Sequence, residues 1–405
     1  MIVFCEACGG KNSVSAEPDG AAGVSQRCRI CDEPVRKDAA AEAVPVSSQP
    51  PPEEKLRVMI VDDSALIRQA VRRIVETSRH LSVAGEAKHG AEALDLLPPT
   101  DPDVITLDIN MPVMDGLTAL KHIMIQKPTP TVVFSTLTQE GSREAFRALE
   151  YGAVDVMHKP SRVAEIDLHQ QQRTIVQKIG LAADVKTEAI RYIRNRDLPP
   201  KKNATDSLAP EYAVTIGAAE GGYSGLLRII PRLRPDVRAA FLVLLYAPAN
   251  HVEDFARYMD LISAVRVHRA SDGAPLISGV CHIAAENEYK TIEQSGETPL
   301  LRVQPAPFSE RRGAVNMLMF SAAEIFGDRS AGVVLSDKGR DGREGLQEIL
   351  RVGGSGIVQN PNSCLYKEMA QSIIENCNGQ EIVMGGGISH RINMVLENPP
   401  VAVNQ

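Results

Sequence analysis

The chain has 405 residues, of which 43% are hydrophobic and 23% are charged, and its formal net charge is −7. This length predicts roughly two or three soluble globular domains, and the negative charge argues against a general affinity for nucleic acid or anionic membranes. No apolar run is long enough to cross a bilayer and the N-terminus lacks a secretion-signal pattern, so we expect a cytoplasmic protein without membrane insertion.

Two pairs of cysteines lie in residues 1–37. Cys5 and Cys8 form one C-x2-C pair, Cys28 and Cys31 form another, and nineteen residues separate the pairs. This spacing is typical of a Zn²⁺ ion held tetrahedrally by four thiolates. Disulfide pairing is the alternative, which a reducing cytoplasm disfavours. We therefore predict a zinc-ribbon-like segment at this end of the chain.

A linker rich in alanine and proline spans residues 38–55, and the next segment contains four apolar runs that each end in polar or charged residues. An apolar run followed at once by a loop is typical of a buried parallel strand. The carboxyl ends of parallel strands meet at one edge of a sheet, where ligands bind. The side chains expected at this edge are, in chain order, Asp62, Asp63, Asp108, Ser135 and Lys159.

Three acids at one edge would repel one another and raise one another's pKa. A hard cation with oxygen ligands removes this conflict, and Mg²⁺ fits best. Asp108 would then be a carboxylate nucleophile that accepts a phosphoryl group as an acyl phosphate. Lys159 would stabilise charge on the transferring oxygens, and Ser135 would hydrogen-bond the product. The alternative is that the acidic pair after the first strand merely caps the following helix.

This pattern over residues 56–175 closely resembles the receiver domain of two-component response regulators. The resemblance implies a flavodoxin-like fold and a histidine kinase as phosphodonor. It also implies that Asp63 and Asp108 contact the Mg²⁺ ion directly, that Asp62 acts through water and that Asn110 contributes its backbone carbonyl.

A helix predicted from residue 170 to about residue 195 leads through a helical linker over 176–210 to a further domain over 211–398. Apolar strands in this domain are expected at residues 212–216, 239–245, 331–335 and 356–359. Strands alternating with helices predict a doubly wound parallel sheet, and residues 265–269 and 280–284 are expected to form a smaller side pair. The predicted fold class is therefore α/β, with two doubly wound parallel-sheet domains.

Residues 56–398 together resemble the chemotaxis protein-glutamate methylesterase family. The resemblance is carried by a strand that runs into a glycine-rich loop, a proline-containing turn after the next strand, and the segment Asp337-Lys338-Gly339-Arg340-Asp341-Gly342. Members of this family are serine hydrolases that remove methyl groups from glutamate esters on chemoreceptors. Phosphorylation of their receiver domain relieves inhibition.

The catalytic positions implied by this resemblance are only partly retained. Ala219 stands where the family has its serine nucleophile, Tyr246 stands where it has its histidine base, and the orienting acid remains as Asp341. Alanine cannot form an acyl intermediate, and a phenol with a pKa near 10 is a poor base at neutral pH. We therefore expect a degenerate triad.

The preferred hypothesis is a phosphorylation-dependent response regulator whose methylesterase-like domain binds or regulates partners without hydrolysis. The alternative is an active protein-glutamate methylesterase with a non-standard site, in which Ser224 or His251 replaces a missing group. A third possibility makes the zinc-ribbon-like segment the effector. Expected partners are a histidine kinase and possible chemoreceptors, whereas nucleic acid is not expected.

Overall fold

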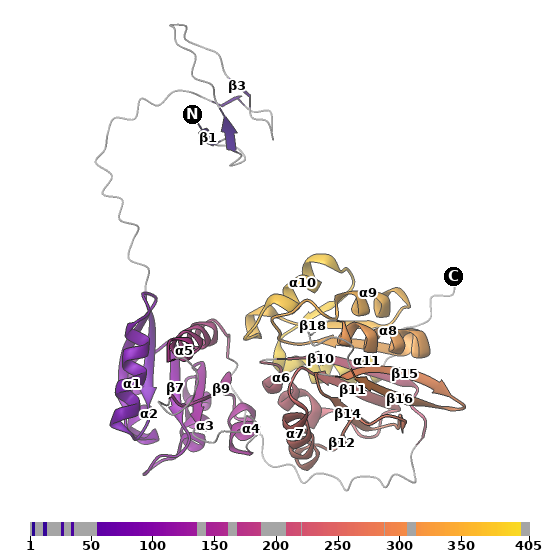
Figure 1. Ribbon diagram of the computed structural model, residues 1–405, viewed down its shortest axis with the longest axis horizontal. Helices are drawn as coiled ribbons and strands as arrows, with labels where there is room; N and C mark the ends of the chain where they lie inside the picture. Colours follow the sequence, from indigo (N-terminus) through magenta and orange to yellow (C-terminus); the bar gives the residue numbers. More distant parts are fainter. Residues whose placement is uncertain are drawn as a thin grey trace. The chain divides into compact units, whose positions relative to one another are not determined.

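The computed structural model of the protein describes residues 55–135, 143–160, 168–187, 208–219, 221–286, 288–305 and 313–397, together with four short strands in the first 35 residues. The chain divides into two compact units, residues 1–53 and residues 54–405 (Figure 1). The larger unit contains both of the parallel sheets that the sequence predicts.

The smaller unit contains two antiparallel hairpins built from very short strands. β1 (Ile2–Phe4) pairs with β2 (Lys11–Ser13), and β3 (Gln26–Arg27) pairs with β4 (Pro34–Val35). Isolated two-stranded hairpins are at best marginally stable in water, so these need further support. The predicted linker over residues 38–55 lies outside the described residues, apart from residue 55.

The first domain of the larger unit is built on a five-stranded parallel sheet in the order β6-β5-β7-β8-β9. Its strands are β5 (Leu56–Val61), β6 (Leu81–Ala87), β7 (Val104–Asp108), β8 (Thr131–Ser135) and β9 (Asp155–His158). The helices are α1 (Ala65–Glu76), α2 (Gly90–Thr100), α3 (Gly116–Gln126), α4 (Arg143–Glu150) and α5 (Leu168–Ala183). This strand order confirms the predicted flavodoxin-like fold.

Helix α5 ends earlier than the sequence predicts. The expected helix ran to about residue 195, whereas α5 stops at Ala183 and residues 184–187 are not helical. Ile175, Ile179 and Ala182 are buried on the α5 face that packs against the receiver sheet. The first residues assigned to the linker thus pack in the receiver core, which Val185 beyond the end of α5 also joins.

The second domain of the larger unit is built on a seven-stranded parallel sheet in the order β12-β14-β11-β10-β17-β18-β19. The strands are β10 (Tyr212–Ala218), β11 (Ala239–Leu245), β12 (Arg266–Arg269), β14 (Val280–Ala284), β17 (Ser330–Val334), β18 (Ser355–Gln359) and β19 (Glu381–Val383). The helices are α6 (Gly222–Ile229), α7 (Ala249–Ile262), α8 (Ala314–Phe326), α9 (Arg343–Arg351), α10 (Glu368–Asn376) and α11 (Ile388–Glu397). The doubly wound α/β prediction is confirmed.

The prediction of a smaller side pair at residues 265–269 and 280–284 is wrong. These residues form β12 and β14, which pair in parallel with each other and extend the main sheet beside β11. All five residues of β14 are buried, so the strand needs cover on both faces, which a surface hairpin cannot give. The small antiparallel sheet instead consists of β13 (Ala274–Pro275), β15 (Glu288–Ser295) and β16 (Thr298–Pro305).

One titratable side chain is buried in the seven-stranded sheet, on β14 next to the edge strand β12. His282 on β14 lies in register with His268 on β12 and is only 6% exposed. Neither of its ring nitrogens has a hydrogen-bond partner within the described part of the chain. Burial, with a smaller contribution from His268, lowers the pKa of His282 to about 4 from an ordinary value of 6.5. The folded protein therefore holds His282 neutral.

This burial predicts acid sensitivity. Between pH 6.5 and 4 the unfolded chain binds a proton at His282 that the folded chain does not, so stability falls as the pH falls through this window, by at most about 3 kcal/mol. Replacing His282 with Leu should flatten the difference in urea midpoint between pH 7 and pH 4. Replacing the exposed His390 of α11 with Gln is the control, because this residue does not contribute to the pKa shift of His282. An unchanged pH dependence in His282→Leu would contradict this assignment.

Candidate functional site

The polar residues at the edge of the receiver sheet lie close together. The Lys159 ammonium is 2.8 Å from Asp62 Oδ2 and 2.9 Å from Asp108 Oδ2. Asp62, Asp108, Ser135 and Lys159 are all buried. The sheet brings them together because each stands at or just after the carboxyl end of β5, β7, β8 or β9, which are neighbours in the parallel sheet.

The electrostatics of this edge are governed by burial and by one cation. Burial raises the pKa of Asp108, and the Lys159 ammonium opposes this effect. Burial alone would lower the pKa of Lys159, but its contacts with Asp62 and Asp108 outweigh burial and raise it. The edge therefore combines a carboxylate in low-dielectric surroundings with a permanently charged donor, which suits the transfer of an anionic group.

Three carboxylates at this edge could also hold a metal ion. One oxygen each of Asp62, Asp63 and Asp108 lies within 4.8 Å of the other two. Asp63 is exposed, which leaves the site open to solvent and to an incoming ligand. Oxygen ligands that keep coordinated water are what Mg²⁺ prefers, so these residues fit that ion. Asn110 is exposed in the loop after β7, and its backbone N–H contacts the Asp108 carboxylate.

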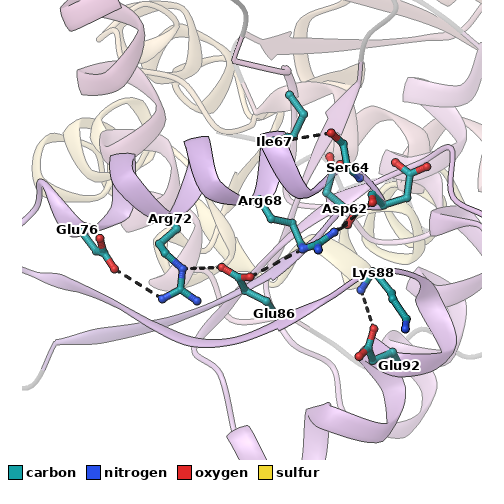
Figure 2. A network of polar contacts seen from close by, with 10 residues as sticks. Asp62, Ser64, Ile67, Arg68, Arg72, Glu76, Glu86, Lys88 and Glu92 are labelled. Carbon is teal, nitrogen blue, oxygen red and sulfur yellow. Dashed lines mark hydrogen bonds and ion pairs between the residues drawn. The ribbon is translucent and has the colours of Figure 1, made fainter.

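The acidic pair has a different role from capping α1. Ser64 is the N-cap residue, and its hydroxyl accepts a hydrogen bond from Ile67 N–H. Asp62 Oδ1 accepts from Ser64 N–H at 2.9 Å, while Asp62 Oδ2 faces Lys159. Arg68 reaches back from α1 and donates to the backbone carbonyls of Asp62 and Asp63 at 2.8 and 3.1 Å (Figure 2). The loop is thus held in place from α1, and its carboxylates stay directed at the sheet edge.

Two supports of this edge were missed by sequence reasoning. Arg68 is one, and Glu86 on β6 keeps it and Arg72 in position through ion pairs at 3.8 and 2.7 Å (Figure 2). Gly116 is the other, because a Cβ there would lie 1.9 Å from the backbone oxygen of Asp108. The glycine after the Pro-containing loop was a usable signal for such a close approach, whereas the arginine carried none.

The three positions that the sequence analysis assigns to a triad lie at the corresponding edge of the second sheet. Ala219 follows β10, Tyr246 follows β11, and Asp341 precedes α9. The Tyr246 hydroxyl donates a hydrogen bond to Asp341 Oδ2. Ala219 and Tyr246 are both buried, with exposed fractions of 0% and 3%. The structure therefore brings base and acid positions together, but places a methyl group at the nucleophile position.

Asp341 is occupied by hydrogen bonds that support the fold. Its oxygens accept from Val315 N–H at 2.9 Å, Asn316 N–H at 3.1 Å and Gly342 N–H at 2.8 Å, in addition to the Tyr246 hydroxyl. The first two donors belong to the first turn of α8, whose N-cap is a glycine without a side chain. Asp341 thus supplies the cap that α8 lacks.

The Tyr246 hydroxyl can act as a hydrogen-bond donor, but it is unsuited to act as a base that removes a proton from a nucleophile. Burial, followed by the negative charge of Asp341, raises the pKa of Tyr246 far above the ordinary value of 10. A phenol held in its neutral form has no basic nitrogen equivalent to that of histidine. The pair is therefore a structural hydrogen bond in this geometry.

Ser224 and His251, which the sequence analysis considered as replacements for the nucleophile or the base, do not contact Asp341 through any of its hydrogen bonds among the described residues. Ser224 is inside α6, where its hydroxyl donates to Gly221 O at 3.1 Å. His251 is in the first turn of α7 and is half-buried.

The receiver contacts the second domain through α4. Phe146 stacks on Tyr223 of α6 with ring centroids 6.1 Å apart, and packs edge-on against Phe255 of α7 at 5.1 Å. The Tyr258 hydroxyl of α7 donates to Glu150 Oε2 at 2.5 Å. This aromatic cluster, which we define as Phe146, Tyr223, Phe255 and Tyr258, links the two domains.

The four cysteines at positions 5, 8, 28 and 31 lie outside the described residues. Cys281, Cys364 and Cys377 are free and buried. No helix in the described ranges is both long and apolar enough to pass through a bilayer.

Comparison with known proteins matches both domains to families. Residues 214–392 match the CheB methylesterase family, and residues 58–171 match the response regulator receiver domain family. A protein-glutamate methylesterase/protein-glutamine glutaminase from Pyrococcus abyssi is 35% identical over 324 residues, covering 79% of this chain and 88% of that protein. A protein of the same name from Bradyrhizobium diazoefficiens, of the group 3 operon, is 33% identical over 362 residues, covering 87% of this chain and 99% of that protein.

Solved structures of Thermotoga maritima CheB are also similar. The methylesterase catalytic domain has a TM-score of 0.44 and 24% identity, covering 46% of this chain and 100% of that chain. The response regulator domain has a TM-score of 0.31 and 38% identity, covering 33% of this chain and 99% of that chain.

The hydrogen bonds of Asp341 predict that its contribution is to stability. Tyr246→Phe should lower the free energy of unfolding by about 1–2 kcal/mol, since one donor to a part-buried carboxylate is lost. Asp341→Ala should cost more, because two N–H groups of α8 and the buried phenol lose their acceptor. Urea unfolding measures both effects, with Tyr212→Phe as the control. Equal stability of Tyr246→Phe and the control would contradict this role.

Proposed function

This chain belongs to the CheB methylesterase family, with a response regulator receiver domain ahead of the methylesterase domain, and on that premise we propose that it is a phosphorylation-dependent response regulator of chemotaxis-type two-component signalling. Asp108 is the proposed phospho-acceptor and a histidine kinase the proposed phosphodonor. The observation that carries the proposal is the Lys159 ammonium, which lies within 2.9 Å of both Asp62 and Asp108 at the buried edge of the sheet.

The proposed transfer uses the residues of this edge in distinct roles. Asp63, Asp108 and the carbonyl of Asn110 would hold Mg²⁺ directly, with Asp62 acting through water, and the ion would neutralise charge on the phosphoryl oxygens. A carboxylate oxygen of Asp108 attacks phosphorus, the bond from phosphorus to the kinase imidazole breaks, and an acyl phosphate results. Lys159 pairs with the transferred group, and the Ser135 hydroxyl donates a hydrogen bond to it.

Phosphorylation would reach the second domain through α4. Ser135 ends β8, and α4 is the next described element along the chain. A hydrogen bond from Ser135 to the phosphoryl group would shift the end of β8 and favour a different position of α4. The aromatic cluster and the bond between Glu150 and Tyr258 are the contacts that such a shift would alter.

We propose that the methylesterase domain does not hydrolyse esters by the serine mechanism and acts as a binding or regulatory module. The support is geometric. The nucleophile position is a buried alanine, the base position is a neutral phenol, and the acid has accepted four hydrogen bonds. Chemoreceptors or other signalling proteins are the proposed partners, and the cytoplasm is the proposed location.

A second candidate function is protein-glutamate methylesterase activity through a non-standard site. The printed names of relatives that are 33–35% identical over most of the chain favour it. It requires a nucleophile other than residue 219. Release of methanol from methylated receptor by the unaltered chain, abolished by Asp341→Ala in a variant that remains folded, would establish this candidate in place of the preceding one.

Phosphorylation itself gives a direct prediction. With Mg²⁺ and acetyl phosphate, the full-length chain should gain one phosphoryl group by intact mass, and hydroxylamine should remove it because acyl phosphates are labile. Asp108→Asn and chelation of Mg²⁺ should each abolish the gain, whereas Asp95→Asn on the exposed face of α2 should not. A stable label that persists in Asp108→Asn would refute the assignment of the acceptor.

Introducing a serine at position 219 and a histidine at position 246 tests the proposal that the methylesterase domain does not hydrolyse esters. The unaltered chain should release methanol at the background rate, while Ala219→Ser combined with Tyr246→His should raise the rate by at least roughly tenfold, since Asp341 is already in place. Each single variant should stay at background, because nucleophile and base act as a unit. Adding Asp341→Asn to the double variant is the control and should lower the rate again. Hydrolysis by the unaltered chain at the rate of the double variant would overturn this proposal.

A further inference from the structure

The two hairpins of the smaller unit close at equivalent positions relative to their cysteines. In the first hairpin Phe4 pairs with Lys11, and in the second Arg27 pairs with Pro34. The sequence between the paired residues is Cys-Glu-Ala-Cys-Gly-Gly in the first hairpin and Cys-Arg-Ile-Cys-Asp-Glu in the second. Both connections therefore have the same length, with cysteine at the first and fourth positions.

This equivalence goes beyond the spacing within each C-x2-C pair. In both hairpins the first cysteine directly follows the last paired residue of the incoming strand. A tetrahedral thiolate site assembled from two loops needs two cysteines from each, presented in the same way. The backbone pairing of the strands and the spacing of the cysteines in the sequence thus repeat twice, although the cysteines themselves lie outside the described residues.

The smaller unit needs a source of stability beyond its paired strands. Its paired strands contain only two or three residues each. Hairpins of this size cannot offset the conformational entropy of ordering their chain, and segments below about 40 residues usually need a metal, disulfides or a partner. A structural zinc site contributes on the order of 10 kcal/mol of folding free energy at neutral pH.

We propose that Cys5, Cys8, Cys28 and Cys31 hold one structural Zn²⁺ as a tetrathiolate, and that residues 1–37 fold only with this ion bound. Binding releases four thiol protons and changes the oxidation state of neither sulfur nor metal. With all four positions filled by thiolates, the ion has no open position for a substrate, so the site is structural. This inference does not rest on phosphorylation at Asp108 or on the state of the degenerate triad, so each can fail separately.

The test is the metal content and thiol count of the full-length chain, purified under reducing conditions without a metal-binding tag. Elemental analysis should find about one zinc per chain. Cys5→Ser and Cys28→Ser should each retain less than about a tenth of it after dialysis, because either change removes one ligand of the same ion. Glu6→Ser and Arg29→Ser, which alter the loop residue next to a cysteine, are the matched controls and should retain zinc.

A second measurement covers variants that fail to fold. Chelation of zinc from the unaltered chain should expose protease cleavage sites within residues 1–37, and added zinc should protect them again. Co²⁺ in place of zinc should give the intense thiolate-to-metal charge-transfer absorption of a tetrathiolate site. Zinc-free protein with two disulfides among these cysteines, iron in place of zinc, or full zinc retention in Cys5→Ser would each overturn the proposal.

Discussion

The receiver domain depends on the contact between one ammonium group and two buried carboxylates. Lys159 stands after β9, Asp62 after β5 and Asp108 at the end of β7, so the contact ties together strands distributed across the whole sheet. Buried charges are costly unless paired, and breaking such a pair typically costs about 3–5 kcal/mol. The arrangement is therefore stable only while each charge keeps its partners, and transfer of a dianionic group to Asp108 necessarily redistributes them.

The second domain also has a carboxylate at the edge of its sheet, but the oxygens of this carboxylate are occupied by hydrogen-bond donors. Asp108 keeps an oxygen directed at a cation and at an open site, whereas Asp341 has its oxygens engaged by three backbone N–H groups and a phenol. A carboxylate engaged in this way stabilises a helix end, and its bond to the Tyr246 hydroxyl occupies the oxygen that a histidine at position 246 would use. The two carboxylates thus differ in the donors around them and in how accessible their oxygens are.

Much of this was predictable from the sequence, for identifiable reasons. Buried parallel strands are continuous apolar runs, and the residue that ends each run must lie at the sheet edge, so Asp62, Asp108, Ser135 and Lys159 could be placed together. The position of β12 and β14 could not, because a short apolar run reads the same at the edge of a large sheet as in a small one. The predicted α5 was too long because helical periodicity in the sequence fades gradually, whereas the helix ends at Ala183 although Val185 still packs in the core.

Contacts between distant side chains lay beyond sequence reasoning. Arg68 donates to the backbone of the acidic loop, and Tyr246 to Asp341, across separations that no local pattern encodes. The Tyr246 substitution itself was visible, and it predicted the loss of a base. That the phenol donates a hydrogen bond to Asp341, in the turn before α9, could be seen only in the folded structure.

The contact between α4 and the second domain does not depend on the residues at the triad positions. Tyr223 and Phe255 belong to α6 and α7, the helices that directly follow the nucleophile and base positions Ala219 and Tyr246. The receiver therefore packs on the elements that carry the degenerate positions, yet the aromatic cluster contains neither of those residues. A shift of α4 can reposition α6 and α7 whether or not a hydroxyl and an imidazole are present. Under the proposed function, phosphorylation would therefore reach α6 and α7 through the same contacts whether the second domain binds a partner or hydrolyses a substrate.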